Sequence, residues 1–108
     1  MALTRNFKDT LQARASADVA FRQALFQEAV QLLLEGEIST GRSILRDYIN
    51  ATIGFETLAE ATQTPEKSLM RMFGPKGNPT VAHLFAVINT LQNRTGVHLE
   101  VRAVTEVA

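Results

Sequence analysis

Apolar residues recur at helical spacing along most of this chain, and a Gly or Pro interrupts each repeat after a few turns. In the clearest case, Val81, Leu84, Phe85, Ile88 and Leu91 fall on one face of a helix. Short helices of this kind bury their apolar faces by packing against one another. We therefore predict an all-α domain of five to six helices, with helical segments at residues 18–34, 40–53, 55–62, 65–73 and 80–92.

The sequence also marks where these helices begin and end. Asp18 is expected to cap the first helix, and Ser39 or Thr40 the second, because a short oxygen-bearing side chain can accept a hydrogen bond from a free backbone N–H group. A glycine that adopts a left-handed conformation ends a helix cheaply. We expect the first, second and last helices to end at Gly36, Gly54 and Gly96.

The C-terminal part of the chain has a different pattern. Residues 97–102 alternate apolar and polar side chains, as in a half-buried strand. We predict a short strand over residues 97–104. A single strand cannot satisfy its own backbone hydrogen bonds, and no second strand is visible in the sequence. We expect it to pair with the same strand of another copy, antiparallel across the axis of a homodimer.

The length of 108 residues predicts one domain. We place it at residues 17–108, preceded by an N-terminal arm over residues 1–16, in which Phe7 and Leu11 suggest a short helix. Apolar residues make up 45% of the chain, but no apolar run approaches the roughly 20 residues that cross a bilayer, and no signal-peptide core is seen. We expect a cytoplasmic protein without a membrane partner.

Several classes of chemistry find no support in the residues. The chain has no Cys, which excludes disulfides, thiolate metal sites and cysteine catalysis. His83 and His98 are the only histidines, and they have no carboxylate pattern around them that would hold a metal. A Gly-x-Ser-x-Gly element and a Gly-Lys-Ser/Thr element are also absent. We expect neither an enzyme nor a cofactor.

The eleven basic and eleven acidic residues are unevenly distributed. Residues 17–60 hold three basic and seven acidic residues, a net charge of −4. Between Lys67 and Lys76 there are three basic residues and no acid. A small basic stretch on an acidic body is typical of a protein that contacts phosphates locally.

The most informative segment is residues 54–73. Two short helices separated by about three residues form a helix-turn-helix, whose second helix can enter the DNA major groove. Ala59 is small enough for a close crossing of the two helices. The apolar side chains that hold this crossing are expected to be Phe55, Leu58, Leu69, Met72 and Phe73.

The second helix of this pair is predicted to begin at Thr64 and Pro65. Thr64 can cap it, and Pro65 suits its first position, where no amide hydrogen is missed. The residues then left on its outer face, available to base edges and phosphates, are Glu66, Lys67, Ser68 and Arg71. Lys76 follows in a loop that leads into the next helix, whose positive N-terminus also favours phosphate.

The segment resembles a known family. The chain is similar, over roughly residues 40–102, to the addiction-module antidote (HigA-like antitoxin) branch of the Cro/repressor-type (Xre) helix-turn-helix regulators. The resemblance is carried by Gly54, Phe55, Leu58, Ala59, Thr62, Ser68, Leu69 and Gly77-Asn78-Pro79-Thr80. It implies a compact repressor-like domain that binds operator DNA as a dimer. The DNA-binding residues it implies, together with the capping position, are Thr64, Glu66, Lys67, Ser68, Arg71, Lys76 and Asn78.

One residue departs from the family pattern. Gln63 occupies the turn position where these proteins usually have Gly. If this position requires a positive φ, Gln destabilises the turn by about 1 kcal/mol relative to Gly. A different turn would tilt the second helix and change the residues that reach DNA.

Three interpretations follow from these observations. The first is a dimeric, sequence-specific DNA-binding regulator, a repressor, which is also the antitoxin of a type II toxin–antitoxin module if it neutralises a toxin. The second is a protein-interaction module that neutralises a RelE/HigB-like ribonuclease toxin through its acidic half, with DNA binding secondary. The third is a catalytic function, which only a metal or substrate in a pocket would support. For residues 65–73 by themselves, the alternative is a core helix whose charges are merely solvated.

Overall fold

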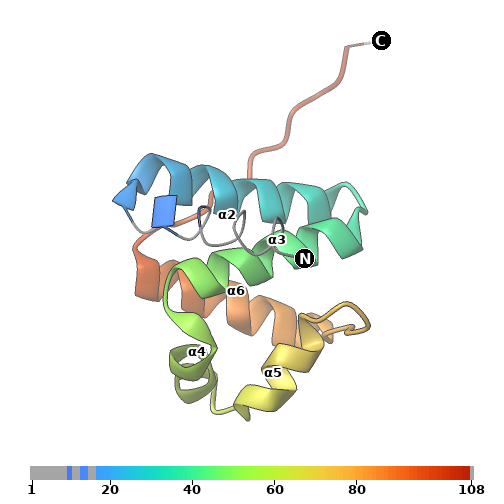
Figure 1. Cartoon of the computed structure of the whole chain (residues 1–108). Coiled ribbons are helices and arrows are strands. Elements are labelled where there is room, and N and C mark those ends of the chain that lie inside the picture. Colours follow the sequence, from blue (N-terminus) through green and yellow to red (C-terminus); the bar gives the residue numbers. More distant parts are fainter. Residues whose placement is uncertain (1–9, 11–12, 15–16, 108) are drawn as a thin grey trace.

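The computed structural model describes residues 10, 13–14 and 17–107, so most of the expected N-terminal arm, including Phe7 and Leu11, lies outside the described residues. The described part of the chain is all-α, as predicted, and contains no β-strand. Its helices are α2 (Val19–Leu34), α3 (Ile38–Ala51), α4 (Gly54–Thr62), α5 (Glu66–Met72) and α6 (Val81–Thr95). Figure 1 shows α2 and α3 as an antiparallel pair, with α4 and α5 on the side away from α2.

The connection between α2 and α3 is shorter than predicted. Asp18 caps α2 as expected, since its carboxylate accepts a hydrogen bond from the Phe21 N–H at 3.1 Å. However, α3 begins at Ile38 rather than Thr40, and its N-cap is Glu37, which makes no side-chain cap bond. The prediction of Ser39 or Thr40 as the cap is wrong. Gly36 has a φ of 85°, and the Glu37 N–H bonds the Leu32 carbonyl. The chain therefore completes the turn at Glu37, and α3 begins at the next residue.

The end of α3 is also earlier than predicted. The helix ends at Ala51, because Thr52 leaves the helical conformation, with a ψ of −99°. The Thr52 hydroxyl donates to the Tyr48 carbonyl at 2.7 Å. Gly54 does adopt the expected positive φ of 78°, but it is the first residue of α4 rather than the end of α3.

α2 and α3 approach each other closely. Gly41 on α3 is buried, and a Cβ atom at this position would lie 2.9 Å from the Ala29 carbonyl oxygen and from the Leu33 side chain. A Cβ atom essentially never lies this close to a carbonyl oxygen, so a larger residue at position 41 would force the two helices to shift. Glycine therefore brings the two backbones into direct contact at this point.

Tyr48 links three helices in the centre of the core. Its ring is fully buried and stacks on Phe26 of α2, with ring centroids 4.5 Å apart and planes inclined by 12°. Its hydroxyl donates to the Thr95 hydroxyl at 2.9 Å, and Thr95 in turn donates to the Leu91 carbonyl within α6. The Tyr48 side chain thus joins α2 and α3 to the last turn of α6.

The buried face of α6 differs from the predicted one. Leu84, Ile88 and Leu91 pack in or against the core as expected, and Val87 is buried beside them. Val81 and Phe85, however, are 73% and 60% exposed. A helix that lies against other helices on one side buries only a narrow stripe of its apolar residues, and that stripe runs through Leu84, Val87, Ile88 and Leu91.

The predicted strand over residues 97–104 is not a strand in the single chain. Gly96, with a φ of 77°, ends α6 as predicted. Beyond it, Val97 is buried and Leu99 packs against the core, but the segment has no neighbouring strand among the described residues. Without a partner its backbone N–H and C=O groups cannot form a ladder, so the residues stay irregular.

Burial raises the pKa of the Tyr48 hydroxyl above its ordinary value, opposed by the hydrogen bond to Thr95 and the positive charge of Arg22. The folded protein therefore holds this proton more tightly than the unfolded chain, and the resulting stability is present below about pH 10 and is lost as the pH rises further. We predict that Tyr48→Phe lowers the free energy of unfolding by about 1 kcal/mol and flattens its alkaline pH dependence.

Tyr48 is the only tyrosine and the chain has no tryptophan, so the ultraviolet absorbance of tyrosinate reports its ionisation directly. A titration midpoint at the ordinary value for an exposed tyrosine, with the protein still folded, would contradict this prediction. Denaturant unfolding of both proteins across the alkaline range supplies the comparison.

Candidate functional site

A tight turn sets the relative position of α4 and α5. Gln63, with a φ of 53° and a ψ of 42°, is left-handed, and is the one non-glycine residue with positive φ in the described chain. In this conformation the Gln63 N–H bonds the Glu60 carbonyl at 3.3 Å, and the Thr64 N–H bonds the Ala59 carbonyl at 3.1 Å. The turn between α4 and α5 therefore has left-handed geometry at a residue that carries a side chain.

The start of α5 differs from the prediction. Thr64 does not cap the helix, and its hydroxyl donates back to the Thr62 carbonyl at 3.2 Å. Pro65 is the N-cap residue rather than the first helical residue, with an extended conformation. Its carbonyl accepts hydrogen bonds from the Ser68 and Leu69 N–H groups at 3.0 and 3.1 Å. The chain itself, rather than a side chain, closes the first turn of α5.

The apolar contact between α4 and α5 follows the prediction. Phe55 and Leu58 on α4 are buried, as are Leu69 and Phe73 at the other helix, and Ala59 and Met72 pack partly buried against them. The rings of Phe55 and Phe73 lie 6.4 Å apart at an angle of 53°. Because α5 has only seven residues, this contact rather than intrinsic helix stability holds it in place.

The opposite face of α5 is open to solvent. Glu66, Lys67 and Arg71 are exposed, and Ser68 is partly buried. Met70 is also exposed, and no sequence pattern singled it out. Lys76 and Asn78 are exposed in the loop that follows, whereas Thr64 is partly buried. The structure therefore brings six of the seven predicted residues to the surface of α5 or its exit loop, and leaves Thr64 in the turn.

The basic side chains on this surface are not neutralised by neighbours. In the described part of the chain, Lys67, Arg71 and Lys76 make no ion pair and no side-chain hydrogen bond. An unpaired cation at a surface keeps its full attraction for an external anion. The surface formed by Glu66, Lys67, Arg71, Lys76 and Asn78, which we call the α5 surface, is therefore available to an anionic ligand.

The loop after α5 packs directly against the end of that helix. A Cβ atom on Gly77 would overlap the carbonyl oxygens of Arg71 and Met72, so only glycine allows this approach. The Gly74 N–H bonds the Arg71 carbonyl at 3.1 Å, and the Gly77 N–H bonds the Gly74 carbonyl at 3.0 Å. The loop that carries Lys76 is consequently held close to Arg71.

Arg42 is a site residue that sequence reasoning missed. From α3, its guanidinium donates to the Gly77 carbonyl at 2.5 Å and to the Pro75 carbonyl at 3.1 Å. These two bonds tie the loop on either side of Lys76 to the body of the protein. No local pattern indicates this role, because Arg42 lies more than thirty residues before its partners.

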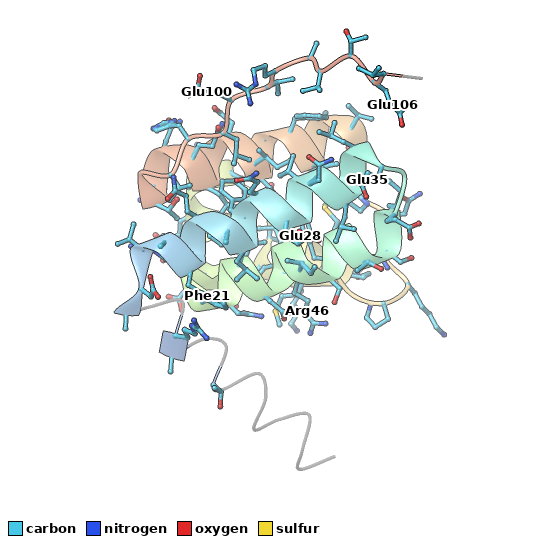
Figure 2. All side chains as sticks on the ribbon, turned by 90° about the horizontal axis from the view of Figure 1, so that it is seen from above. Phe21, Glu28, Glu35, Arg46, Glu100 and Glu106 are labelled. Carbon is cyan, nitrogen blue, oxygen red and sulfur yellow. The ribbon has the colours of Figure 1, made fainter. Side chains whose placement is uncertain are left out.

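A small hollow adjoins this loop. It has a volume of about 280 Å³, and two arginines and two serines of α3 face three residues of the α5 exit. Arg46 is partly buried and makes no ion pair in the described chain. Figure 2 shows Arg46 on the side of α3 away from α2. The lining residues are Ser39, Arg42, Ser43, Arg46, Phe73, Gly74 and Pro75.

Comparison of the chain with protein-family models, with curated proteins and with solved structures finds no match. Within the described residues, no group of three or more His, Cys, Asp and Glu side chains could hold a metal ion. Among the helices described, none is long and apolar enough to cross a membrane.

Replacement of Gln63 tests the turn. A left-handed conformation disfavours a residue with a Cβ atom by about 1 kcal/mol relative to glycine. We predict that Gln63→Gly raises the free energy of unfolding by up to this amount without changing the fold, as measured by urea unfolding. A matched Gln27→Gly substitution, at an exposed position inside α2, should lower it. A loss of stability in Gln63→Gly would contradict the left-handed assignment.

Replacement of Arg42 tests the loop attachment. We predict that Arg42→Met, which keeps the aliphatic stem and removes both hydrogen bonds, accelerates amide hydrogen exchange at Gly77 and its neighbours at least tenfold and leaves exchange in α2 unchanged. Arg46→Met serves as the matched control, since Arg46 makes no such bond to the loop. Equal exchange in the wild-type protein and in Arg42→Met would mean that the loop is held by Gly77 packing alone.

Proposed function

We propose that this protein is a sequence-specific DNA-binding regulator of transcription, a repressor, that places α5 in the major groove. The observation that carries the proposal is the two-sided character of α5. Leu69 and Phe73 brace it from behind, while Lys67 and Arg71 extend in front without a partner in the described chain. A solvated core helix needs no such unpaired cations on one face, and a recognition helix does.

Arg71 is the strongest candidate for reading a base. A guanidinium can donate two hydrogen bonds to the major-groove edge of guanine, or to a phosphate. Ser68 lies about one turn before Arg71, where its hydroxyl can contact a base or phosphate. Glu66 is the first residue of α5, and its carboxylate can accept from cytosine. These residues would give the sequence preference.

Phosphate contacts would fix the protein on the duplex. Lys76 and Asn78 extend from the loop that Arg42 and Gly77 hold against the end of α5. The hollow beside this loop adds Arg46 to the cationic side chains nearby. We assign Lys76, Asn78 and Arg46 to the DNA backbone.

A dimer suits this mode of binding. Repressors of this type bind two half-sites that lie about one helical turn apart, and the two-fold symmetry of the operator matches that of the protein. The exposed apolar residues outside the core, among them Phe85 and the C-terminal valines, leave surface for a second copy.

A second function is compatible with the first. Glu28, Glu35 and Glu37 are exposed on α2 and in the α2–α3 turn, and Figure 2 shows Glu28 and Glu35 along the outer side of α2. An acidic surface opposite the α5 side would suit a basic ribonuclease toxin of the RelE/HigB kind. Co-purification of a basic product of a neighbouring reading frame, lost on reversal of these three charges, would make the protein an antitoxin.

Removal of charge from the α5 surface tests DNA binding. We predict that Arg71→Ala and Lys76→Ala each weaken binding to a selected operator at least tenfold, because each removes a charge-assisted contact. Lys76→Ala should also reduce the slope of log affinity against log salt by about 0.9, since one fewer counterion is released. Fluorescence anisotropy over a salt series gives both quantities.

Arg94→Ala is the matched control, because Arg94 is exposed at the opposite end of α6 from the Lys76 loop. It should leave the affinity and the slope unchanged. If random and selected duplexes bind alike, or if all three variants behave as the wild-type protein, the proposed DNA-binding function is wrong.

A further inference from the structure

The segment after α6 leaves the helical body with its apolar residues uncovered. Val97 and Leu99 are seated against the core, but Val101, Val104 and Val107 are 90%, 81% and 93% exposed. Figure 1 shows the end of this segment as an extended stretch that projects beyond α2, away from α4 and α5. Valine is a strong strand former, and three exposed valines in an extended stretch are typical of an edge strand whose partner strand is not in the same chain.

The backbone of this segment is equally without partners. The Leu99 N–H donates to the Gln92 side-chain oxygen at 2.8 Å, but from residue 100 to residue 107 no backbone hydrogen bond occurs within the described chain. In an extended chain, consecutive N–H groups point to opposite edges. If the segment becomes a strand and keeps the Leu99 bond, the edge that includes Leu99 faces α6 and the edge formed by residues 98, 100, 102 and 104 is free.

We propose that this free edge pairs, antiparallel, with the same edge of a second copy, and that Val101 lies on the two-fold axis. In this register Glu100 of each copy faces Arg102 of the other, so two pairs of opposite charges form. Val101 faces Val101 of the second copy, and Leu99 faces Ala103. Opposite charges and β-branched pairs are the cross-strand contacts that stabilise a ribbon.

Symmetry and charge leave few alternatives. When two copies pair through the same edge, even-numbered residues face even-numbered residues and odd-numbered residues face odd-numbered residues. The two-fold axis therefore passes through a residue and not between two residues. An axis at Glu100 or Arg102 would place like charges face to face. An axis at Val104 would pair Arg102 with Glu106, but it would leave Val97 and Leu99 outside the ribbon. The Val101 register instead includes Leu99, which already packs against the core. Because this part of the segment is already ordered, less conformational entropy is lost when the strands pair.

A cleft beside the segment supports the same arrangement. It has a volume of about 650 Å³ and lies between residues 98–104 and α2. Three glutamines, Gln23, Gln27 and Gln31, recur every four residues along its α2 wall. Amide side chains can donate to and accept from an exposed backbone, which an extended segment presents and a helix does not. A second strand beside the first would lie next to this wall.

The inference rests on the dimeric regulator proposed above, but its tests use the free protein without DNA. The chain has no cysteine, so a single introduced cysteine reports the register. At a non-hydrogen-bonded pair on the axis the two Cα atoms lie about 4.5 Å apart, within the range for a disulfide. We expect Val101→Cys to form a cross-linked dimer under mild oxidation.

Val104→Cys is the matched control. In the Val101 register, position 104 and its counterpart lie roughly 20 Å apart, because three residues separate each from the axis. It should remain monomeric on a denaturing gel at a protein concentration where Val101→Cys is cross-linked. Cross-linking of Val104→Cys alone would overturn the register in favour of the Glu106 pairing. Cross-linking of neither would overturn the ribbon.

Charge reversal tests the same pairing without cysteine. Glu100→Arg and Arg102→Glu each place like charges opposite each other twice, so we expect the dissociation constant of the homodimer to rise at least tenfold for each variant. An equimolar mixture of the two variants restores both opposite pairs. We expect the two variants in this mixture to form a heterodimer whose dissociation constant, measured by analytical ultracentrifugation, equals that of the wild-type homodimer.

Both side chains are exposed, so neither variant is expected to unfold, and circular dichroism verifies this. Glu106→Arg, a reversal on the same segment, should leave the dimer unchanged. A wild-type protein that is monomeric at high concentration, or a mixture that does not recover, overturns the proposal. If the ribbon fails while the Arg71 and Lys76 variants still lose DNA affinity, the DNA-binding function stands without this contact.

Discussion

The buried Tyr48 side chain is the contact on which the rest of the structure depends. Its ring stacks on Phe26 of α2, and its hydroxyl reaches Thr95 at the end of α6. The Thr95 hydroxyl oxygen also accepts a hydrogen bond from the Val97 N–H, with a nitrogen–oxygen distance of 3.4 Å. The hydrogen-bonded Tyr48 and Thr95 hydroxyls therefore lie where the C-terminal segment leaves α6. A small domain has little buried surface, and a polar bond in its centre is stabilising only when both partners are satisfied, as they are here.

The position of α5 follows from this core rather than from α5 itself. A helix of seven residues is unstable alone, and it is held by the apolar contact with α4 and by the loop behind it. That loop is fastened twice, by the close approach of Gly77 to the carbonyl groups of α5 and by the two hydrogen bonds from Arg42. Rigid support from behind would allow the cationic side chains in front to meet the proposed DNA ligand in one defined geometry.

The two surfaces that we assign to function lie on different parts of the fold. The α5 surface carries unpaired positive charge, whereas the segment after Gly96 carries unpaired backbone and exposed valine. The first suits an anionic duplex and the second suits another strand, so they do not compete for one partner. A dimer formed through the C-terminal segment would leave both copies of α5 uncovered, as binding to two half-sites requires.

Local sequence alone determined the helices and most of their ends. Asp18 and Gly96 act through their immediate neighbours, and the burial of Phe55, Leu58 and Leu69 follows from their spacing along short amphipathic helices, so all of these could be predicted. Thr64 is not the cap because α5 begins one residue later, with Pro65 as its N-cap, and the Thr64 hydroxyl donates to the Thr62 carbonyl instead.

Only the tertiary structure decided which apolar residues are buried and what holds the loop. Phe85 belongs to the apolar face of α6 by spacing, but no helix covers it. Arg42 meets the loop across more than thirty residues, a distance that no local pattern spans. Residues 97–104 have the sequence of a strand and remain irregular in one chain, because strand formation depends on a neighbour whose backbone supplies the hydrogen bonds.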